Sequence, residues 1–217
     1  MELGVVITHE PAEMSAPFAL DSTLYGLVRP AVDRRADVRL ALPGRGAVAV
    51  LASQGRYRIV GEDPVTVCAE DRRLYRVQRL RSGDGATAQT TAAGSIDELY
   101  WTIGYAASGG RLVDALAPTD VLQLTEWPNL TRVPLGPHGL RLAVLMRRRP
   151  TSIPVAASIA RAPRAHVQRF VSAAWSASLI RVVNRASSVA DARERAENPT
   201  PTGMSVVKSL LRRLRGD

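Results

Sequence analysis

Ten arginines and no acidic residue lie in a stretch of 64 residues, between positions 127 and 190 of the chain. Residues 1–126 hold thirteen arginines against sixteen acidic residues, a net charge of −3, and residues 191–217 have a net charge of +2. The basic block at 127–190 therefore carries nearly all of the formal charge of +9. A folded block with charges of one sign repels itself, so an anionic molecule is its natural partner.

The composition is that of a globular protein. Of the 217 residues, 46% are hydrophobic and 23% are charged, and the chain is long enough to bury a core. No apolar run approaches the roughly 18 residues that cross a bilayer, and the acidic first ten residues do not form a signal peptide. The lone Cys68 excludes an internal disulfide. We therefore expect a cytoplasmic protein, most simply a bacterial one.

The choice of arginine over lysine makes the total charge a weaker indication of an anionic partner. Lys208 is the only lysine, and the other 28 basic residues are arginine, as the codon bias of a GC-rich genome would produce. The absence of acidic residues from the basic block is the better indication of an anionic partner.

From residue 37 the sequence alternates between apolar and polar positions with a period of two, which is typical of strands. Residues 43–46 have the composition of a hairpin turn, and residues 82–94 that of a small polar loop. The alternation predicts an antiparallel β-meander. Its expected strands are 38–42, 47–52, 56–60, 66–68 and 74–80.

A helix is predicted at 96–107. Ser95 and Glu98 have the spacing of a capping box, in which each side chain bonds the backbone N–H of the other. Glycines at 109 and 110 end the helix, and residues 121–126 alternate like one more strand. With a boundary placed near 127–136, residues 1–130 are predicted to form an α+β domain whose role the sequence does not indicate.

The sequence pattern of the basic block predicts a small helical domain at 137–190. Proline at 137 suits the first turn of a helix over 138–148, which proline at 150 stops. A second helix is expected at about 153–161 and a third over 163–181, with a strand near 180–183 and a turn or wing at 184–188. The predicted fold class is thus α+β, with a mixed N-terminal domain and a C-terminal domain of three helices.

Residues 147–183 resemble the winged helix-turn-helix superfamily in this order of helices and strand. The resemblance implies that the second and third helices share a core that includes Val155 and Ile159, and that the exposed side of the third lies in a DNA major groove. On that side stand Arg164, Gln168, Arg169 and Ser172, where arginine suits guanine and glutamine suits adenine. Small residues on the same side (Ala165, Ala173, Ser176) also suit a close contact between helices.

The other arginines receive supporting roles in this interpretation. Three consecutive arginines end the first helix and would hold phosphates together with Arg161, while Arg181 and Arg185 would flank the wing. The residues predicted to contact nucleic acid or another anion are Arg147, Arg148, Arg149, Arg161, Arg164, Gln168, Arg169, Arg181 and Arg185.

Three alternatives stay open. The block can be a plain helical unit whose arginines are solvated or pair with the acidic N-terminal part. Winged helices also serve as protein-interaction modules, and consecutive arginines at 147–149 can bind the phosphates of a nucleotide messenger. The sequence therefore predicts a regulatory protein that binds nucleic acid, or alternatively an adaptor that contacts a protein or an anionic nucleotide.

Nothing in the sequence indicates an enzyme. The three histidines have no metal-ligand spacing, and the common nucleophile and phosphate-binding motifs are missing. Cys68 lies between apolar residues and is expected to be a small buried side chain. The predictions are no catalytic residue, no metal and no cofactor.

Residues 191–217 are predicted to be a linker and a short tail. The segment 204–215 combines four basic residues with apolar ones at helical spacing. It predicts a weak accessory contact with an anionic membrane surface or with a partner's groove.

Overall fold

Alternating side chains in the first part of the chain build an antiparallel sheet of five strands, in the order β4-β1-β2-β3-β5. The computed structural model describes residues 16–80 and 90–185, so the predicted tail at 191–217 and part of the predicted wing lie outside the described residues. The strands are β1 (Val38–Leu42), β2 (Gly46–Leu51), β3 (Arg56–Gly61), β4 (Arg76–Arg79) and β5 (Ala92–Ser95). The meander is confirmed for its first three strands.

Two short segments differ from the prediction. Residues 66–68 belong to a helix, α2 (Pro64–Cys68), because Asp63 accepts hydrogen bonds from the backbone N–H groups of Val65 and Thr66 and a proline follows it at the first helical position. This N-cap outweighs the strand preference of three residues. The last residues of the predicted loop at 82–94 belong to strand β5, which pairs with β3. This pairing uses backbone hydrogen bonds, and the small side chains of β5 give no alternating pattern from which a strand could be predicted.

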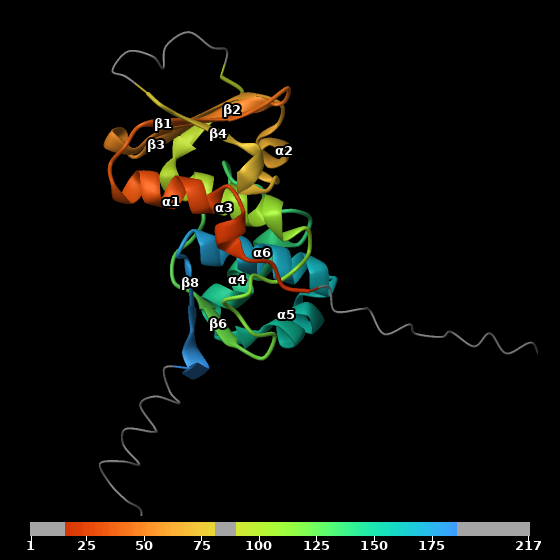
Figure 1. The fold of residues 1–217 in the computed structure, drawn as a ribbon. Helices are drawn as coiled ribbons and strands as arrows, with labels where there is room; N and C mark the ends of the chain where they lie inside the picture. The colour runs from red at the N-terminus through yellow and green to blue at the C-terminus, as the bar shows by residue number, and fades with distance from the viewer. Residues whose placement is uncertain (1–15, 81–89, 186–217) are drawn as a thin grey trace, which may run out of the picture.

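Helices cover one face of this sheet (Figure 1). They are α1 (Tyr25–Asp33) and α3 (Ile96–Ser108), with short 3-10 turns at Leu20–Ser22, Ala52–Gln54 and Arg72–Leu74. The capping box of α3 is confirmed, since Ser95 Oγ accepts from Glu98 N at 3.3 Å and Glu98 Oε2 accepts from Ser95 N at 3.2 Å. The helix ends at Gly109, whose φ of 55° is left-handed.

A second antiparallel sheet has the order β7-β6-β8. It consists of β6 (Val121–Leu124), β7 (Thr151–Ser152) and β8 (Ile180–Val182), and it packs with α4 (Gly139–Arg148), α5 (Ile153–Ala160) and α6 (Arg164–Ser176). The three predicted helices of the basic block are thus present, although the third ends five residues early, before Ser178 adopts a φ of 59°. The structure is a mixed α+β fold with antiparallel sheets.

Helix α6 joins the two parts of the molecule by packing along α3. Phe170 of α6 meets Trp101 of α3 edge to face, with ring centroids 5.4 Å apart, and both are buried in one hydrophobic core that contains residues of both sheets. Strand β6 precedes the predicted boundary but pairs with β7 and β8 from beyond it. A division into residues 1–130 and 137–190 stays a prediction.

None of the helices in the described ranges is long and apolar enough to cross a membrane.

Helices α3 and α6 approach each other closely at Gly104, which leads to a prediction about stability. A Cβ at this position would lie 2.1 Å from Ser176 Oγ and 2.8 Å from the backbone oxygen of Ser172. Gly104→Ala should therefore lower the free energy of unfolding by about 1–3 kcal/mol, even though alanine favours a helix by roughly 1 kcal/mol over glycine.

Chemical denaturation measures this change, with Ser158→Ala on the exposed side of α5 as the control. The control should stay within about 0.5 kcal/mol of the parent. Equal stability of Gly104→Ala and the parent would contradict the close packing of α3 on α6.

Cys68 provides a second prediction. Its side chain is fully buried in α2, and burial raises the pKa of the thiol, so little thiolate exists at neutral pH. We expect the native protein to resist a thiol reagent at pH 8 and to react fully after denaturation, as followed by mass spectrometry. Rapid modification of the native protein would show that α2 opens readily.

Candidate functional site

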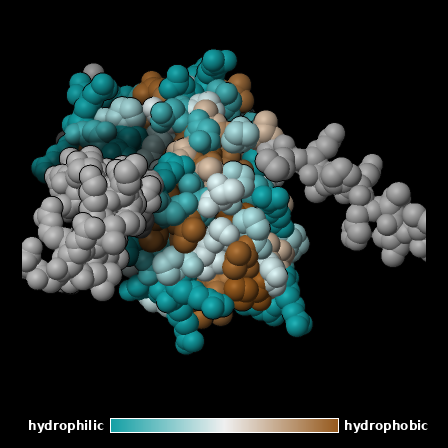
Figure 2. Space-filling model, turned by 90° about the horizontal axis from the view of Figure 1, so that it is seen from below, coloured by the Kyte–Doolittle hydropathy of each residue, from teal (hydrophilic) through white to brown (hydrophobic). Residues whose placement is uncertain are grey.

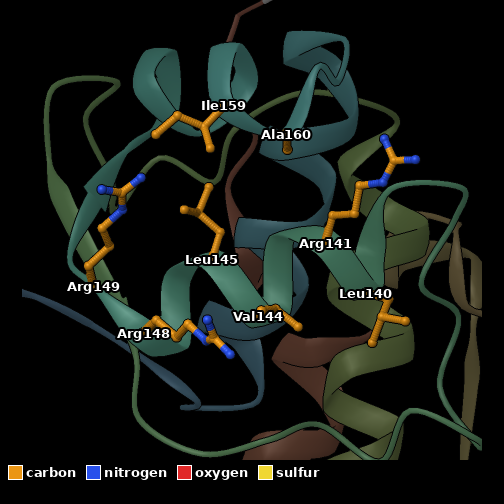
Figure 3. Close-up of a pocket in the computed structure, with 8 residues that line it drawn as sticks. All are labelled: Leu140, Arg141, Val144, Leu145, Arg148, Arg149, Ile159 and Ala160. Carbon is orange, nitrogen blue, oxygen red and sulfur yellow. The ribbon is translucent and has the colours of Figure 1, made fainter.

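Helices α4 and α5 line an open groove of about 640 Å³. The groove is lined by Leu140, Arg141, Val144, Leu145, Arg148, Arg149, Ile159 and Ala160. In Figure 3, Leu145 of α4 and Ile159 of α5 point toward each other across it, while Arg141 and Arg149 lie at opposite sides. The result is an apolar floor with three arginines at its rim.

The sequence of α4 explains the apolar floor. Leu142, Ala143 and Met146 are buried against the protein, yet leucine and valine also occupy positions on the outer side of the helix. Leu140 is 58% exposed there, while Val144 and Leu145 are half-buried. An α-helix with apolar side chains on its inner and its outer faces is typical of a helix that has a partner on both.

Helix α5 adds a second exposed apolar strip. The prediction that Val155 and Ile159 lie in a core shared with the third helix is wrong, because they are 49% and 46% exposed. Ile153, Ala156 and Ala160 take the inner face of α5 instead. Figure 2, which views the molecule from below Figure 1, shows hydrophobic patches bordered by hydrophilic side chains on this side.

Nine of the ten arginines of the basic block fall into two sets, and the tenth, Arg169, is described with α6 below. In one set the side chains bond other parts of the protein: Arg132 pairs with Glu98 at 3.5 Å, Arg185 with Asp120 at 2.6 Å, and Arg181 bonds the Gln123 side chain. Pairing with acids of the N-terminal part, one of the predicted alternatives, thus occurs for two arginines.

The second set lies on the surface of α4 and around α5. Arg141, Arg147, Arg148 and Arg149 are exposed, as are Arg161 and Arg164 at the turn between α5 and α6. Among the described residues, 16–80 and 90–185, no carboxylate pairs with the side chain of any of these six. Of the predicted anion-binding residues, the structure therefore brings Arg148 and Arg149 together at the groove and leaves Arg181 and Arg185 elsewhere.

The side of α6 that was expected to read DNA bases is largely occupied. The prediction that Ser172 is exposed there is wrong, because it is fully buried and its Oγ accepts from Val113 N at 3.0 Å. Arg169 is half-buried, donates to the backbone oxygen of Tyr105 at 2.9 Å, and lies 4.4 Å over the Tyr105 ring. Gln168 is half-buried and Arg164 is exposed.

Small side chains explain this burial. Ser172 and Ser176 lie four residues apart on α6, and Ala165 lies seven residues before Ser172; all three face α3 or the residues that follow it. Ala165 meets Gly110, while Ser176 donates to the backbone oxygen of Tyr100 at 2.8 Å. The contact between helices that the small residues also allowed is the one that forms.

A second, smaller pocket lies near the start of α4. The rings of His138 and His166 are 5.2 Å apart there, beside Arg169. Its volume of about 50 Å³ holds little more than a water molecule. No group of three or more metal-ligating side chains occurs in the part of the chain that the structure describes.

The sequence missed Leu140, Arg141, Leu145 and Ile159 as a site. An available signal was the leucine and valine on the outer side of the first predicted helix, directly beside arginines in a stretch without acidic residues. A scan against protein-family models and searches of curated proteins and of solved structures found no match to this chain.

Proposed function

We propose that this protein is a non-catalytic adaptor that binds an amphipathic, acidic segment of a partner protein in the groove between α4 and α5. The single observation that carries the proposal is the combination in that groove of an apolar floor with three arginines that have no carboxylate partner among the described residues. Apolar side chains of the partner would cover Leu145 and Ile159, and its carboxylates would meet the arginine rim.

The shape and chemistry of the groove favour a peptide. An amphipathic helix laid into an apolar groove is a recurring mode of recognition, with apolar anchors at helical spacing. Covering apolar surface contributes about 25 cal/mol per Å², and arginine binds carboxylates with paired hydrogen bonds. The floor and the rim therefore match the two faces of one acidic amphipathic segment.

Nucleic acid fits the groove less well. Base reading in the major groove uses a helix or a β-ribbon that projects into it, whereas this site is concave and its floor is apolar. Ser172 and Arg169, two of the four predicted base-reading residues, contact other parts of the protein. The exposed Arg147, Arg161 and Arg164 keep nucleic acid as the second candidate, and its binding is an outcome of the test below.

The winged-helix assignment of residues 137–190 is part of this proposal. The chain order α4, β7, α5, α6, β8 supports it, because a winged helix places a short strand between its first two helices and another after the third. Strand β6, which pairs with both β7 and β8, departs from the expected pattern. Such domains bind proteins as well as DNA, so this assignment is compatible with an adaptor.

The apolar floor is tested by Ile159→Ser in the full chain. The probe is a synthetic 16-residue peptide with leucines at helical spacing and glutamates on both flanks, and binding is followed by fluorescence anisotropy. Loss of the isoleucine contact should weaken binding about tenfold, equivalent to ~1.4 kcal/mol.

Val155→Ser is the matched control. Val155 lies on the same helix and is equally exposed, but it does not line the groove. Its substitution should leave the affinity within about twofold. Equal losses from both substitutions would place the binding surface outside the groove.

The arginine rim is tested by Arg148→Glu, with Arg147→Glu as the control of equal charge. Arg148 lines the groove and the neighbouring Arg147 does not. We expect the peptide's affinity to fall about tenfold for Arg148→Glu and much less for Arg147→Glu, with the difference shrinking at high salt.

Random duplex DNA is titrated against the same variants. Sequence-independent contacts to phosphate would make Arg147→Glu and Arg148→Glu act alike and would leave Ile159→Ser without effect. That result, together with no binding of the acidic peptide, would overturn the adaptor proposal and favour nucleic acid.

A further inference from the structure

The point where residues 1–15 join the fold is fixed by Phe18. Its backbone N donates to the oxygen of Leu112 at 3.0 Å, its own oxygen accepts from Asp114 N at 3.0 Å, and its ring is buried. The neighbouring Gly110 approaches Ala165 in the first turn of α6, which follows α5 directly. In Figure 1 this red end of the described chain emerges beside α6, on the side where α5 lies.

The groove is therefore within reach of residues 1–15. An extended chain spans about 3.3 Å per residue, so nine residues before position 16 already reach about 30 Å. Ala160, at the end of α5, lines the groove and is only four residues from the start of α6.

The composition of residues 1–15 complements the groove in charge and in apolar character. The segment contains Glu2, Glu10 and Glu13 and no lysine or arginine, which gives it a net charge of −3. Between these glutamates lies the apolar run of Val5, Val6 and Ile7. Its apolar side chains match the floor, and its carboxylates match Arg141, Arg148 and Arg149 at the rim.

The other two segments outside the described residues do not match. Residues 186–217 have a net charge of +2, and their apolar part at 204–215 is basic, so the rim would repel it. Residues 81–89 contain one arginine, one aspartate and otherwise only small or polar side chains. Only residues 1–15 combine apolar side chains with a clear negative charge.

We propose that residues 1–15 occupy the groove between α4 and α5 of the same chain, with Val5–Ile7 over Leu145 and Ile159, and compete there with the partner's acidic segment. The competition rests on the proposed function, whereas the docking itself does not. A short tether gives an effective concentration on the order of 1 mM, so even an intrinsic dissociation constant of about 0.1 mM keeps the groove about ten-elevenths occupied. Binding of a partner is then weakened about tenfold.

Paramagnetic relaxation in the full chain tests the docking. Thr8→Cys receives a spin label, and the new thiol is the reactive one because Cys68, the single cysteine of the sequence, is buried. The methyl signals of Leu145 and Ile159 should broaden, and those of Leu40 and Ile59 in the first sheet should not. The same label at Ser205→Cys is the control and should leave the groove methyls sharp.

The outcomes divide cleanly. Sharp methyl signals at Leu145 and Ile159 with the label on residue 8 would overturn the proposal. Broadening in a mixture of spin-labelled chains with separately methyl-labelled chains would assign the groove to a second copy and would also overturn docking within one chain.

A charge exchange tests the role of the rim. Glu10→Arg with Glu13→Arg should abolish the broadening, and adding Arg148→Glu with Arg149→Glu should restore it, which a merely structural effect of either pair would not do. Broadening that is indifferent to both pairs would overturn the ionic part of the contact.

The acidic 16-residue peptide separates this inference from the proposed function. With Glu10→Arg and Glu13→Arg, the affinity of the peptide for the groove should rise about tenfold, because residues 1–15 no longer compete for it. Unchanged affinity that still depends on Ile159 would remove the inference and keep the adaptor function. Broadening of the groove methyls in a chain that binds no peptide would keep the docking and remove the adaptor function.

Discussion

The contact between α3 and α6 determines what the rest of the molecule presents to its surroundings. At Gly104 the two helices approach so closely that the backbone of one meets the Ser172 and Ser176 side of the other. Hydroxyl groups are tolerated in this buried contact because each finds a backbone partner: Ser176 donates to Tyr100, and Ser172 accepts from Val113. The contact thereby fastens the second sheet and its helices to the first.

Helix α6 has little surface left after this contact. Its small residues face α3, and Val167, Phe170, Val171 and Ala174 are buried in the core. Among α4, α5 and α6, the large apolar side chains that stay exposed are Leu140 on α4 and Val155 and Ile159 on α5. A helix that packs inside the protein over most of its circumference presents few side chains to a DNA groove, and the apolar outer faces of α4 and α5 support the proposed peptide site instead.

Much of this architecture follows from local sequence. Strong local signals, such as the capping box at Ser95 and the alternation from Val38, identify α3 and β1 because the deciding interactions lie within a few residues. The same logic failed at Thr66, where a single aspartate three positions earlier decided for a helix. It also failed for β5 and for the partners of β6, since pairing between strands far apart in sequence is set by the whole fold.

The candidate site was harder to predict for a physical reason. An apolar stripe shows that a helix buries one face, but it does not tell which of several stripes meets the core, so Val155 and Ile159 were assigned inward and lie outward. Small residues on α6 were compatible with a groove of DNA or with a neighbouring helix, and only the position of Gly104 decides between them. The arginines alone pointed to an anion without indicating its kind.

The two components of the groove have different roles in recognition. Exposed arginines at a rim mainly raise the rate of encounter and select for negative charge, because water and salt screen much of their attraction. In the proposed complex the apolar floor would supply most of the affinity, because covering it releases water whatever the ionic strength. Phosphates alone would satisfy the rim and leave the floor uncovered, while an uncharged apolar helix would cover the floor and leave three arginines unpaired. The proposed ligand, apolar on one face and acidic at its edges, satisfies both, and the packing of α6 on α3 supports the proposal because it leaves the exposed apolar side chains to α4 and α5.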